Sequence, residues 1–376
     1  MQICICRVRV EYVNLRDICK INMGQSPEST SYNSDKQGVP FYQGNADFGA
    51  LYPNPRIWCS KPIKLAKEND ILISVRAPVG ALNFSKEECC IGRGLAAITL
   101  VSNDFLIEFI YWSLRRGVKE LQSKSTGSTF KSINKKVLEE VKIPKISLKD
   151  QKDIIKNITL LTNILTKYEQ EIVFLDELVK ARFVEMFGDP VSNSRDLPVQ
   201  KMNNVAPICQ YDGSFEESVW LLNLDMIESQ TGRIINYNIV SKDVIGGSVC
   251  TFDENNVLYS KLRPYLNKVV IPDGKGYATS ELVPLRPDPK IINRIYLAYL
   301  LRSNEFVEMI KEKVAGAKMP RVSMSDFREF NVPVPLLELQ NQFASFVQEI
   351  DKSRLRELLA IKQIKLLLHD SWFLFY

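Results

Sequence analysis

The chain has 376 residues, of which 45% are hydrophobic and 25% charged, and its formal net charge is +5. This length and balance are those of a globular protein large enough for two domains with separate cores. The weak positive charge permits nucleic-acid binding through local patches but does not indicate a long cationic tail.

Cysteine and histidine usage bears on metal sites and on the cellular compartment. The eight cysteines have no CxxC spacing, and the single histidine, His369, lies near the C-terminus. Zinc sites need such ligands in pairs, so we expect no metal site. We expect reduced, mostly buried thiols in a cytoplasmic protein. No run of about 18 apolar residues occurs, so we expect no membrane helix, and the alternating residues 1–13 are predicted to form an edge strand, not a signal peptide.

The first part of the chain, residues 1–146, is predicted to be a mixed domain in which strands dominate. Residues 70–75 and 95–101 are apolar runs bounded by turn residues, which is typical of buried strands. Residues 104–116 have apolar side chains at helical spacing and are predicted to form a short helix.

The central segment has the clearest periodicity in the chain. From Ile154 to Val179, and again at Met186 beyond Arg182, apolar residues recur at alternating steps of four and three over more than four heptads, the pattern of a coiled coil. A helix over 153–186 would be roughly 50 Å long at 1.5 Å per residue. The segment 188–190, Gly-Asp-Pro, should end it.

The rest of the chain repeats what precedes it. Residues 315–335 align with 126–146 at an offset of 189 without a gap, and the earlier strands align at offsets of 186 and 187. The segment 294–302 is the predicted counterpart of the first short helix. Small loop insertions explain the drift in offset. Two similar surfaces held at a fixed separation suit a ligand that itself repeats along a line.

A second long helix is predicted near the C-terminus, because the central periodicity reappears there at the same offset. Six of its eight seam positions are apolar, and Arg354 and Glu357 are the exceptions. Two long helices with matching seams are predicted to pack on each other. The alternative is that each helix packs only on its own domain. The seam positions are Phe343, Val347, Ile350, Arg354, Glu357, Ile361, Ile364 and Leu368.

No motif in the chain indicates catalysis. There is no GxxxxGK[ST] phosphate loop, no GxGxxG after a strand and no Asn-Pro-Pro-aromatic segment. A single histidine near the chain end argues against histidine-based acid–base chemistry. We therefore expect no catalytic residue and no cofactor.

Polar loops beside the predicted strands favour a binding function. They hold basic, amide, hydroxyl and aromatic residues in close company. Arginine and lysine bind guanine edges or phosphates, and asparagine or glutamine binds adenine. An ordinary solvated loop is the alternative for each residue. Arg76 and Arg263 are predicted to occupy equivalent places in the two halves. The positions of Lys131 and Arg321 are predicted to be equivalent to within one residue.

The order of these segments resembles the specificity subunit of type I restriction–modification enzymes, over essentially the whole chain. Each motif is moderately specific, but their order and duplication together are highly specific. The segments that carry the resemblance are MGQSP at 23–27, DILISVR at 70–76 with PVG at 78–80, EMFGDP at 185–190, VLYSKLRPYLNKV at 257–269 with ATSEL at 278–282, and LQNQF at 339–343.

The resemblance implies an α+β fold with a pseudo-two-fold internal duplication. Two similar mixed α/β target-recognition domains, 1–146 and 189–335, would be joined by two long antiparallel helices, 147–188 and 336–376, that form a coiled-coil spacer. Each domain would read one half of a bipartite double-stranded DNA site, and the chain would have no catalytic site. The implied partners are methyltransferase (modification) subunits, which carry S-adenosylmethionine, and a restriction subunit that translocates and cuts DNA. The aromatic tail after residue 370 and the polar seam residues depart from the family pattern.

Two other functions stay open: a single-chain DNA methyltransferase or nuclease with the same domains, and a duplicated protein-interaction scaffold. A cofactor motif would mark the first, and binding that does not weaken with salt would mark the second. The candidate DNA-binding residues are Gln25, Ser26, Tyr42, Gln43, Asn45, Ser74, Arg76, Arg93, Ser128, Thr129, Lys131, Tyr211, Asn223, Lys261, Arg263, Tyr265, Lys268, Ser280, Lys318 and Arg321.

Overall fold

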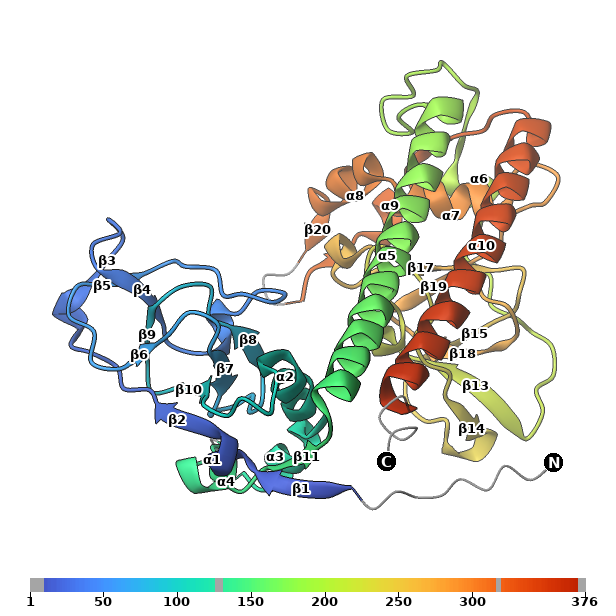
Figure 1. Ribbon diagram of the computed structural model, residues 1–376. Helices are drawn as coiled ribbons and strands as arrows, with labels where there is room; N and C mark the ends of the chain where they lie inside the picture. Colours follow the sequence, from blue (N-terminus) through green and yellow to red (C-terminus); the bar gives the residue numbers. More distant parts are fainter. Residues whose placement is uncertain (1–9, 126–130, 316–318, 371–376) are drawn as a thin grey trace, which may run out of the picture. The chain divides into compact units, whose positions relative to one another are not determined.

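The computed structural model describes residues 10–125, 131–315 and 319–370 (Figure 1). The chain forms two compact units. The first combines the chain up to Leu165 with the segment from Ile364 onward, and the second comprises Thr166–Gln363. No helix of the described residues is long and apolar enough to cross a lipid bilayer.

The first unit is a mixed domain with three sheets, ordered β2-β10-β7-β8, β3-β5-β4-β9-β6 and β1-β11. Its strands are β1 Glu11–Asn14, β2 Cys19–Met23, β3 Tyr32–Asn33, β4 Val39–Tyr42, β5 Trp58–Cys59, β6 Leu65–Ala66, β7 Ile71–Ser74, β8 Leu82–Phe84, β9 Cys89–Ile91, β10 Leu95–Leu100 and β11 Lys142–Lys145. Its short helices are α1 Leu15–Ile18, η1 Ser29–Ser31, η2 Asn45–Asp47, α2 Ile107–Arg116, α3 Val118–Ser123 and α4 Lys135–Glu139.

The second unit repeats this order of elements. Its strands are β12 Val199–Lys201, β13 Ser218–Leu222, β14 Ile239–Ser241, β15 Val249–Phe252, β16 Val257–Ser260, β17 Val269–Val270, β18 Gly276–Thr279, β19 Leu282–Leu285, β20 Val314–Ala315, β21 Arg321–Val322 and β22 Asn331–Pro333. Its short helices are α6 Met202–Val205, η3 Leu224–Met226, η4 Lys242–Val244, η5 Pro264–Leu266, α7 Arg294–Arg302, α8 Asn304–Lys311 and α9 Met324–Glu329. The long helices are α5 Leu148–Phe187 and α10 Leu337–Asp370.

The strand pairings show that both units follow one plan, as the duplication predicted. The parallel pair β4–β9 corresponds to β13–β18, and each parallel pair sits among antiparallel neighbours. The antiparallel pairs β7–β10 and β16–β19 also correspond, as do β1–β11 and β12–β22. Three short helices follow in each unit, α2, α3 and α4 in the first and α7, α8 and α9 in the second.

The central strands β7 and β16 are apolar at their first three positions and end in a buried serine, because each lies between two cores. In β7, Ile71 and Ile73 belong to the core that the helices cover, and Leu72 belongs to a core shared with β9. In β16, Tyr259 and Leu258 face two different cores in the same way. A strand buried on both faces loses the alternation of apolar and polar residues, which explains the continuous apolar runs in the sequence.

A buried glutamine joins each long helix to its domain. Gln151 is 0% exposed; its side-chain oxygen accepts the N–H of Leu106 at 2.8 Å, and its amide donates to the carbonyls of Asp104 and Ile146 at 2.8 and 3.0 Å. These contacts hold residues 104–106 outside the helix, so α2 begins at Ile107 and not at the predicted residue 104.

The second unit contains the same arrangement 189 residues later. Gln340 is 0% exposed and accepts the N–H of Asn293 at 2.8 Å. Its amide donates to the carbonyls of Ile291 and Pro335 at 3.1 and 2.8 Å. The predicted alignment therefore pairs two glutamines that bind the same three backbone groups in each unit.

In the second unit the two long helices pack antiparallel, as predicted (Figure 1). Phe183 of α5 meets Phe343 of α10 with ring centroids 5.4 Å apart, and the earlier residue Asp176 pairs with the later residue Arg354. Phe183 also stacks on Tyr296 of α7. Within the second unit the helices thus pack on each other, as predicted, and also on the domain, so the alternative of packing on the domain alone is wrong.

The first unit contains the other ends of these helices. Leu368 of α10 packs against the core that includes Ile154 and Ile158 of α5. At its far end α5 stops at Phe187, and Gly188 follows with φ +72°, as the stop segment predicted.

Arg354 interrupts the apolar seam because it forms an ion-pair network in the second unit. It is 8% exposed; one nitrogen lies 2.6 Å from Asp176 of α5, and another pairs with Asp351 of its own helix. Glu357 is half-buried, and burial raises its pKa. The positive charge of Arg354 in the seam is therefore balanced by the carboxylate of Asp176 on the other long helix.

Candidate nucleic-acid interface

Five of the predicted DNA-binding residues line one hollow of about 230 Å³ in the first unit. The hollow lies where the loops after β4, β7 and β9 meet. The five residues are Gln43, Asn45, Ser74, Arg76 and Arg93, and Gly44, Ala77 and Gly94 complete the lining.

An acidic residue holds the first of these loops in place. The carboxylate of Asp47 accepts the N–H groups of Gln43 and Gly44 at 2.8 and 3.4 Å and pairs with Arg56. Gly94 packs so closely on this loop that a Cβ there would overlap the carbonyl oxygen of Gln43. The loop backbone is therefore fixed before any ligand binds, which reduces the entropy cost of binding.

The side chains of the hollow divide into exposed and structural groups. Gln43, Arg76 and Arg93 are exposed, and neither guanidinium has a carboxylate partner among the described residues. Ser74 is buried, and its Oγ donates to the carbonyl of Arg76 at 2.7 Å. Tyr42 is 3% exposed, within the core behind the hollow, and burial raises its pKa. Ser74 and Tyr42 thus shape the loops, whereas the exposed groups are free to bind.

The remaining candidates of the first unit flank the hollow. Gln25 is exposed, and the Oγ of Ser26 accepts the N–H of Arg93 at 3.3 Å. Lys131 is exposed beside Ser132, which bridges to Arg76. Ser128 and Thr129 lie outside the described residues.

The second unit brings four of its candidates together at the corresponding place. The N–H of Lys261 donates to the carbonyl of Glu281, next to Ser280, at 3.0 Å. The N–H of Arg263 donates to the carbonyl of Pro320 at 2.8 Å, next to Arg321. Lys261, Arg263 and Ser280, on loops, and Arg321, in β21, therefore lie on neighbouring segments.

The predicted equivalence of Arg76 and Arg263 is off by one residue. Ser260 Oγ donates to the carbonyl of Leu262 at 3.0 Å, as Ser74 does to Arg76, and Leu262 bridges to Arg321 as Arg76 does to Ser132. The counterpart of Arg76 is thus Leu262. Arg263 follows it with a left-handed φ of 49°, at the start of η5.

Other candidates of the second unit have different surroundings. Lys268 is half-buried and its Nζ donates to the carbonyl of Leu224 at 2.6 Å; burial lowers its pKa. Asn223 is half-buried at the end of β13, and Tyr265 is exposed in η5. The ring of Tyr211 lies 5.4 Å from that of Phe215, in a surface cluster. Lys318 lies outside the described residues.

Sequence reasoning missed three residues of these loops, Asp47, Arg56 and Glu281. Asp47 pairs with Arg56, and Glu281 forms an ion pair with the candidate Arg321, its Oε1 lying 2.7 Å from the arginine Nη2. Arg56 could have been included as a basic loop residue. The two acids carried no signal, because only the folded loops bring them to their partners.

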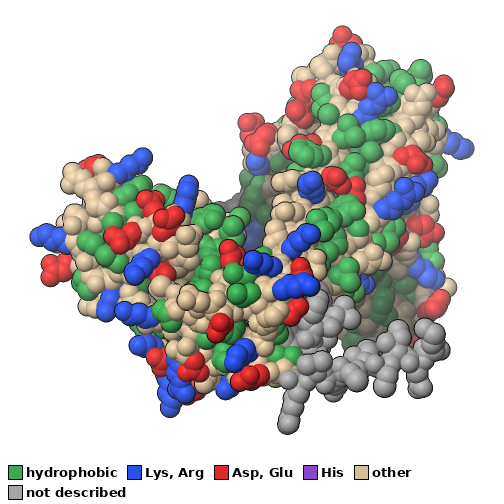
Figure 2. All heavy atoms as spheres, viewed as in Figure 1, with side chains coloured by type: hydrophobic (Ala, Val, Ile, Leu, Met, Phe, Trp, Pro, Cys, Tyr) green, Lys and Arg blue, Asp and Glu red, His purple; other side chains and the backbone are tan. Residues whose placement is uncertain are grey.

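Apolar side chains are exposed on the long helices of the second unit. On α5 these are Val173, Phe174, Leu178 and Val184, and on α10 they are Leu339, Leu355, Leu358 and Leu359. Figure 2 shows apolar side chains at the surface interspersed with charged ones. These side chains leave apolar surface of the helix pair in contact with solvent.

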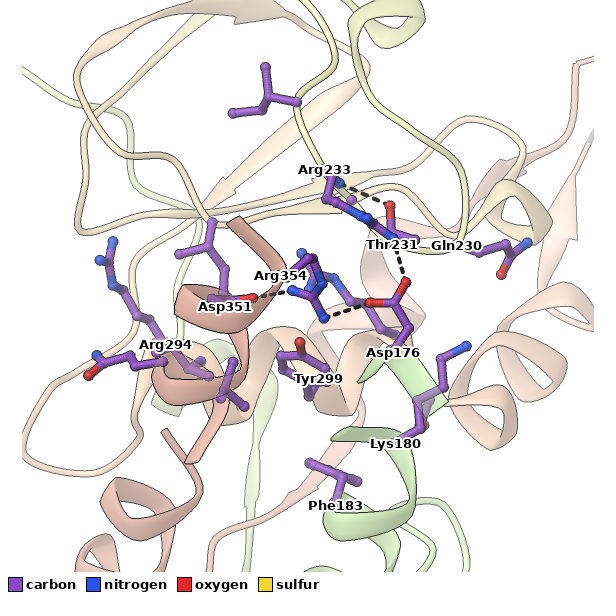
Figure 3. A pocket seen from close by; sticks show the side chains of 18 of the residues that line it. Asp176, Lys180, Phe183, Gln230, Thr231, Arg233, Arg294, Tyr299, Asp351 and Arg354 are labelled. Atoms are coloured by element: carbon purple, nitrogen blue, oxygen red, sulfur yellow. Dashed lines mark hydrogen bonds and ion pairs between the residues drawn. The ribbon is translucent and has the colours of Figure 1, made fainter. Parts of the chain in front are cut away.

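A larger hollow of about 550 Å³ lies in the second unit, between α5, α10 and the loop that contains Arg233 (Figure 3). Its charged lining is mostly paired internally. Asp176 accepts from both Arg233 and Arg354, and Tyr237 donates to Asp273 at 2.8 Å. This network joins the domain to the two helices, which gives it a structural role.

The described residues contain no cluster of three or more His, Cys, Asp or Glu that could hold a metal ion. Within the same residues Cys19, Cys59, Cys89, Cys90 and Cys250 are buried free thiols, and Cys209 is exposed. Burial raises the pKa of Cys19 and of Cys89 to about 12, so these thiols stay protonated at neutral pH.

Comparison with known proteins identifies the family. The family model for the type I restriction modification DNA specificity domain matches residues 7–173 and 225–366. The putative type I restriction enzyme MjaX specificity subunit of Methanocaldococcus jannaschii is 45% identical over 148 residues, which cover 39% of this chain and 34% of that protein. The type I restriction enzyme EcoDI specificity subunit of Escherichia coli is 23% identical over 281 residues, which cover 65% and 62%.

A solved structure shows the same fold over the full chain. The S subunit of a type I restriction-modification system from M. genitalium aligns with a TM-score of 0.56 at 13% identity, and the alignment covers 100% of this chain and 97% of that one. The chain spans about a third of the length of the first curated relative and three-fifths of the second. Because the family model matches both halves, the chain belongs to the family of type I restriction modification DNA specificity domains.

Proposed function

We propose that this chain is the non-catalytic DNA-recognition subunit of a type I restriction–modification system and that it reads a bipartite double-stranded DNA sequence. Residues 1–146 and 189–335 act as the two target-recognition domains, and residues 147–188 and 336–376 act as the helices between them. The observation that carries the proposal is the duplication: both units place polar loops at the ends of corresponding strands.

The chemistry of the loops supports base recognition. Around the first hollow, Gln43 and Asn45 offer amides, which bind adenine at two points, and Arg76 and Arg93 offer guanidinium groups, which bind guanine or phosphate. In the second unit Lys261, Arg263 and Arg321 provide a basic surface. Each domain therefore has the donors that a base pair requires in the major groove.

We also propose that the exposed apolar face of α5 and α10 binds the methyltransferase subunits and that a restriction subunit joins the full complex. Phe174 and Leu178 on α5 and Leu355 and Leu359 on α10 provide the contact surface. The chain itself requires no cofactor, because methylation and cleavage belong to its partners. It acts in the cytoplasm, where its DNA substrate and partners lie.

A selection from random duplex DNA tests this function. The purified chain, alone and with its methyltransferase subunits, should enrich two short conserved sequences separated by an unread gap of constant length. Its affinity should fall steeply with salt, because phosphate contacts release counterions. Binding that is indifferent to sequence under both conditions would contradict the proposal.

The same material distinguishes the alternatives. Methylation or cleavage of DNA by the chain alone would favour an enzyme, and partner binding without salt-dependent DNA binding would favour a scaffold. The control is a Phe174→Ala, Leu355→Ala double variant, which should lose the methyltransferase subunits but retain DNA binding by the free chain.

A further inference from the structure

Arg321 and Glu281 form a multi-point ion pair at the surface of the second unit. The Nε of Arg321 lies 3.1 Å from both carboxylate oxygens of Glu281, and Nη2 lies 2.7 Å from Oε1. The hydrogen bond from Arg321 lowers the pKa of Glu281, and Glu281 raises the pKa of Arg321. Both groups are therefore charged at neutral pH.

The backbone at both ends of this ion pair is held by regular hydrogen bonding. Arg321 belongs to β21, which pairs with β20, and it bridges to Leu262. The carbonyl of Glu281 accepts the N–H of Lys261 at 3.0 Å. The side chain of Glu281 is 21% exposed and that of Arg321 is 44% exposed. The carboxylate is thus mostly covered, and the guanidinium faces solvent.

The contacts of Arg321 leave one edge of its guanidinium available. The carboxylate occupies the edge formed by Nε and Nη2, and Nη1 has no hydrogen-bond partner among the described residues. The N–H groups of Nη1 and the outer N–H of Nη2 form a planar fork. That fork matches the O6 and N7 acceptors of guanine in the major groove. A carboxylate on the other edge removes rotamer freedom before DNA binds.

We propose that Arg321, held by Glu281, reads a guanine in the half-site bound by the second target-recognition domain. Arg321 is the base-contacting residue, and Glu281 is a positioning residue that acts through it. This inference rests on the proposed DNA-recognition function. It goes further because it assigns one base, guanine, and two of its acceptor atoms, O6 and N7, to the side chain of Arg321.

The experiment repeats the random-DNA selection with the full chain and its methyltransferase subunits. It compares the wild type with Arg321→Lys, which retains the positive charge but loses the fork, and with Glu281→Gln, which retains the shape but loses the charge. Arg328→Lys is the matched control, because Arg328 is an exposed arginine of the same unit, on α9. Thermal unfolding of each variant confirms that it is folded.

We expect the wild type to require guanine at one position of one half-site. Arg321→Lys should reduce that preference about tenfold or more and leave every other position and the salt dependence unchanged. Glu281→Gln should weaken the preference at the same position by a smaller factor. Replacing that guanine with 7-deazaguanine, which lacks the N7 acceptor, should weaken wild-type binding about tenfold but leave Arg321→Lys nearly unaffected.

The contrary outcomes distinguish a failure of this inference from a failure of the proposed DNA-recognition function. If Arg321→Lys leaves all base preferences intact, or weakens all sequences equally, Arg321 reads no base although the chain still recognises DNA. If Glu281→Gln changes a different position, Glu281 contacts a base itself and is not a positioning residue. If the wild type enriches no sequence, the proposed function fails as well.

Discussion

Replacing Gln151 with leucine should loosen the contact between α5 and the first domain without affecting the second. The substitution removes the side-chain partners of the Leu106 N–H and of the Asp104 and Ile146 carbonyls. A polar group left unpaired in a partly buried site costs about 1–3 kcal/mol. At the lower end of this range, the three groups together correspond to a loss of about 3 kcal/mol.

Hydrogen exchange read by peptide provides the assay, because it reports the opening free energy of each segment separately. A free-energy change of about 1.4 kcal/mol alters an equilibrium constant tenfold. Gln151→Leu should therefore speed exchange in α2 about 100-fold and leave the exchange rates in α7 unchanged. Gln340→Leu should do the reverse, because its three partners are the counterparts in the second unit.

Exposed glutamines on the same helices serve as controls. Gln170→Leu on α5 and Gln342→Leu on α10 should change the opening free energies by less than about 0.5 kcal/mol. Gln151 does not hold α5 to the first domain if Gln151→Leu loosens α2 and α7 equally, or if it alters exchange in α2 no more than Gln170→Leu does.

Three further perturbations test other parts of the structure. Asp176→Asn leaves Arg233 and Arg354 without their shared carboxylate and should lower the stability of the second unit by about 3 kcal/mol in urea unfolding; a loss below about 0.5 kcal/mol would contradict the network. The pKa of Glu281 is lower in the folded protein than in the unfolded chain, so its ion pair stabilises the fold at any pH above the pKa of the unfolded chain. This stabilisation is lost as the pH falls through the pKa of the folded protein. The thermal midpoints of the wild type and Glu281→Gln should therefore differ at pH 7 and converge in acid. Gly94→Ala places a Cβ against the carbonyl of Gln43 and should abolish base preference in one half-site only, as measured by DNA selection; unchanged preference would show that the hollow does not bind DNA.

The sequence by itself determined the duplicated plan, the central strands and the long helices. Those features follow from sequence patterns: a heptad repeat that ends at Gly188, apolar runs that need burial on both faces, and an offset between halves that changes only in loops. The same offset paired Gln151 with Gln340, although it did not reveal that each binds three backbone groups of its own domain.

Only the tertiary structure decided which loop side chains are available to a ligand. Tyr42 is buried at the end of β4 and the ammonium group of Lys268 is bound to a carbonyl, although the sequence presents both as binding candidates. Arg354 interrupts the heptad in sequence but meets Asp176 on a helix that is distant in the chain, and Glu281 meets Arg321 across two loops. Such pairs form between residues far apart in sequence, so their existence depends on how the loops and helices fold together and not on any local pattern.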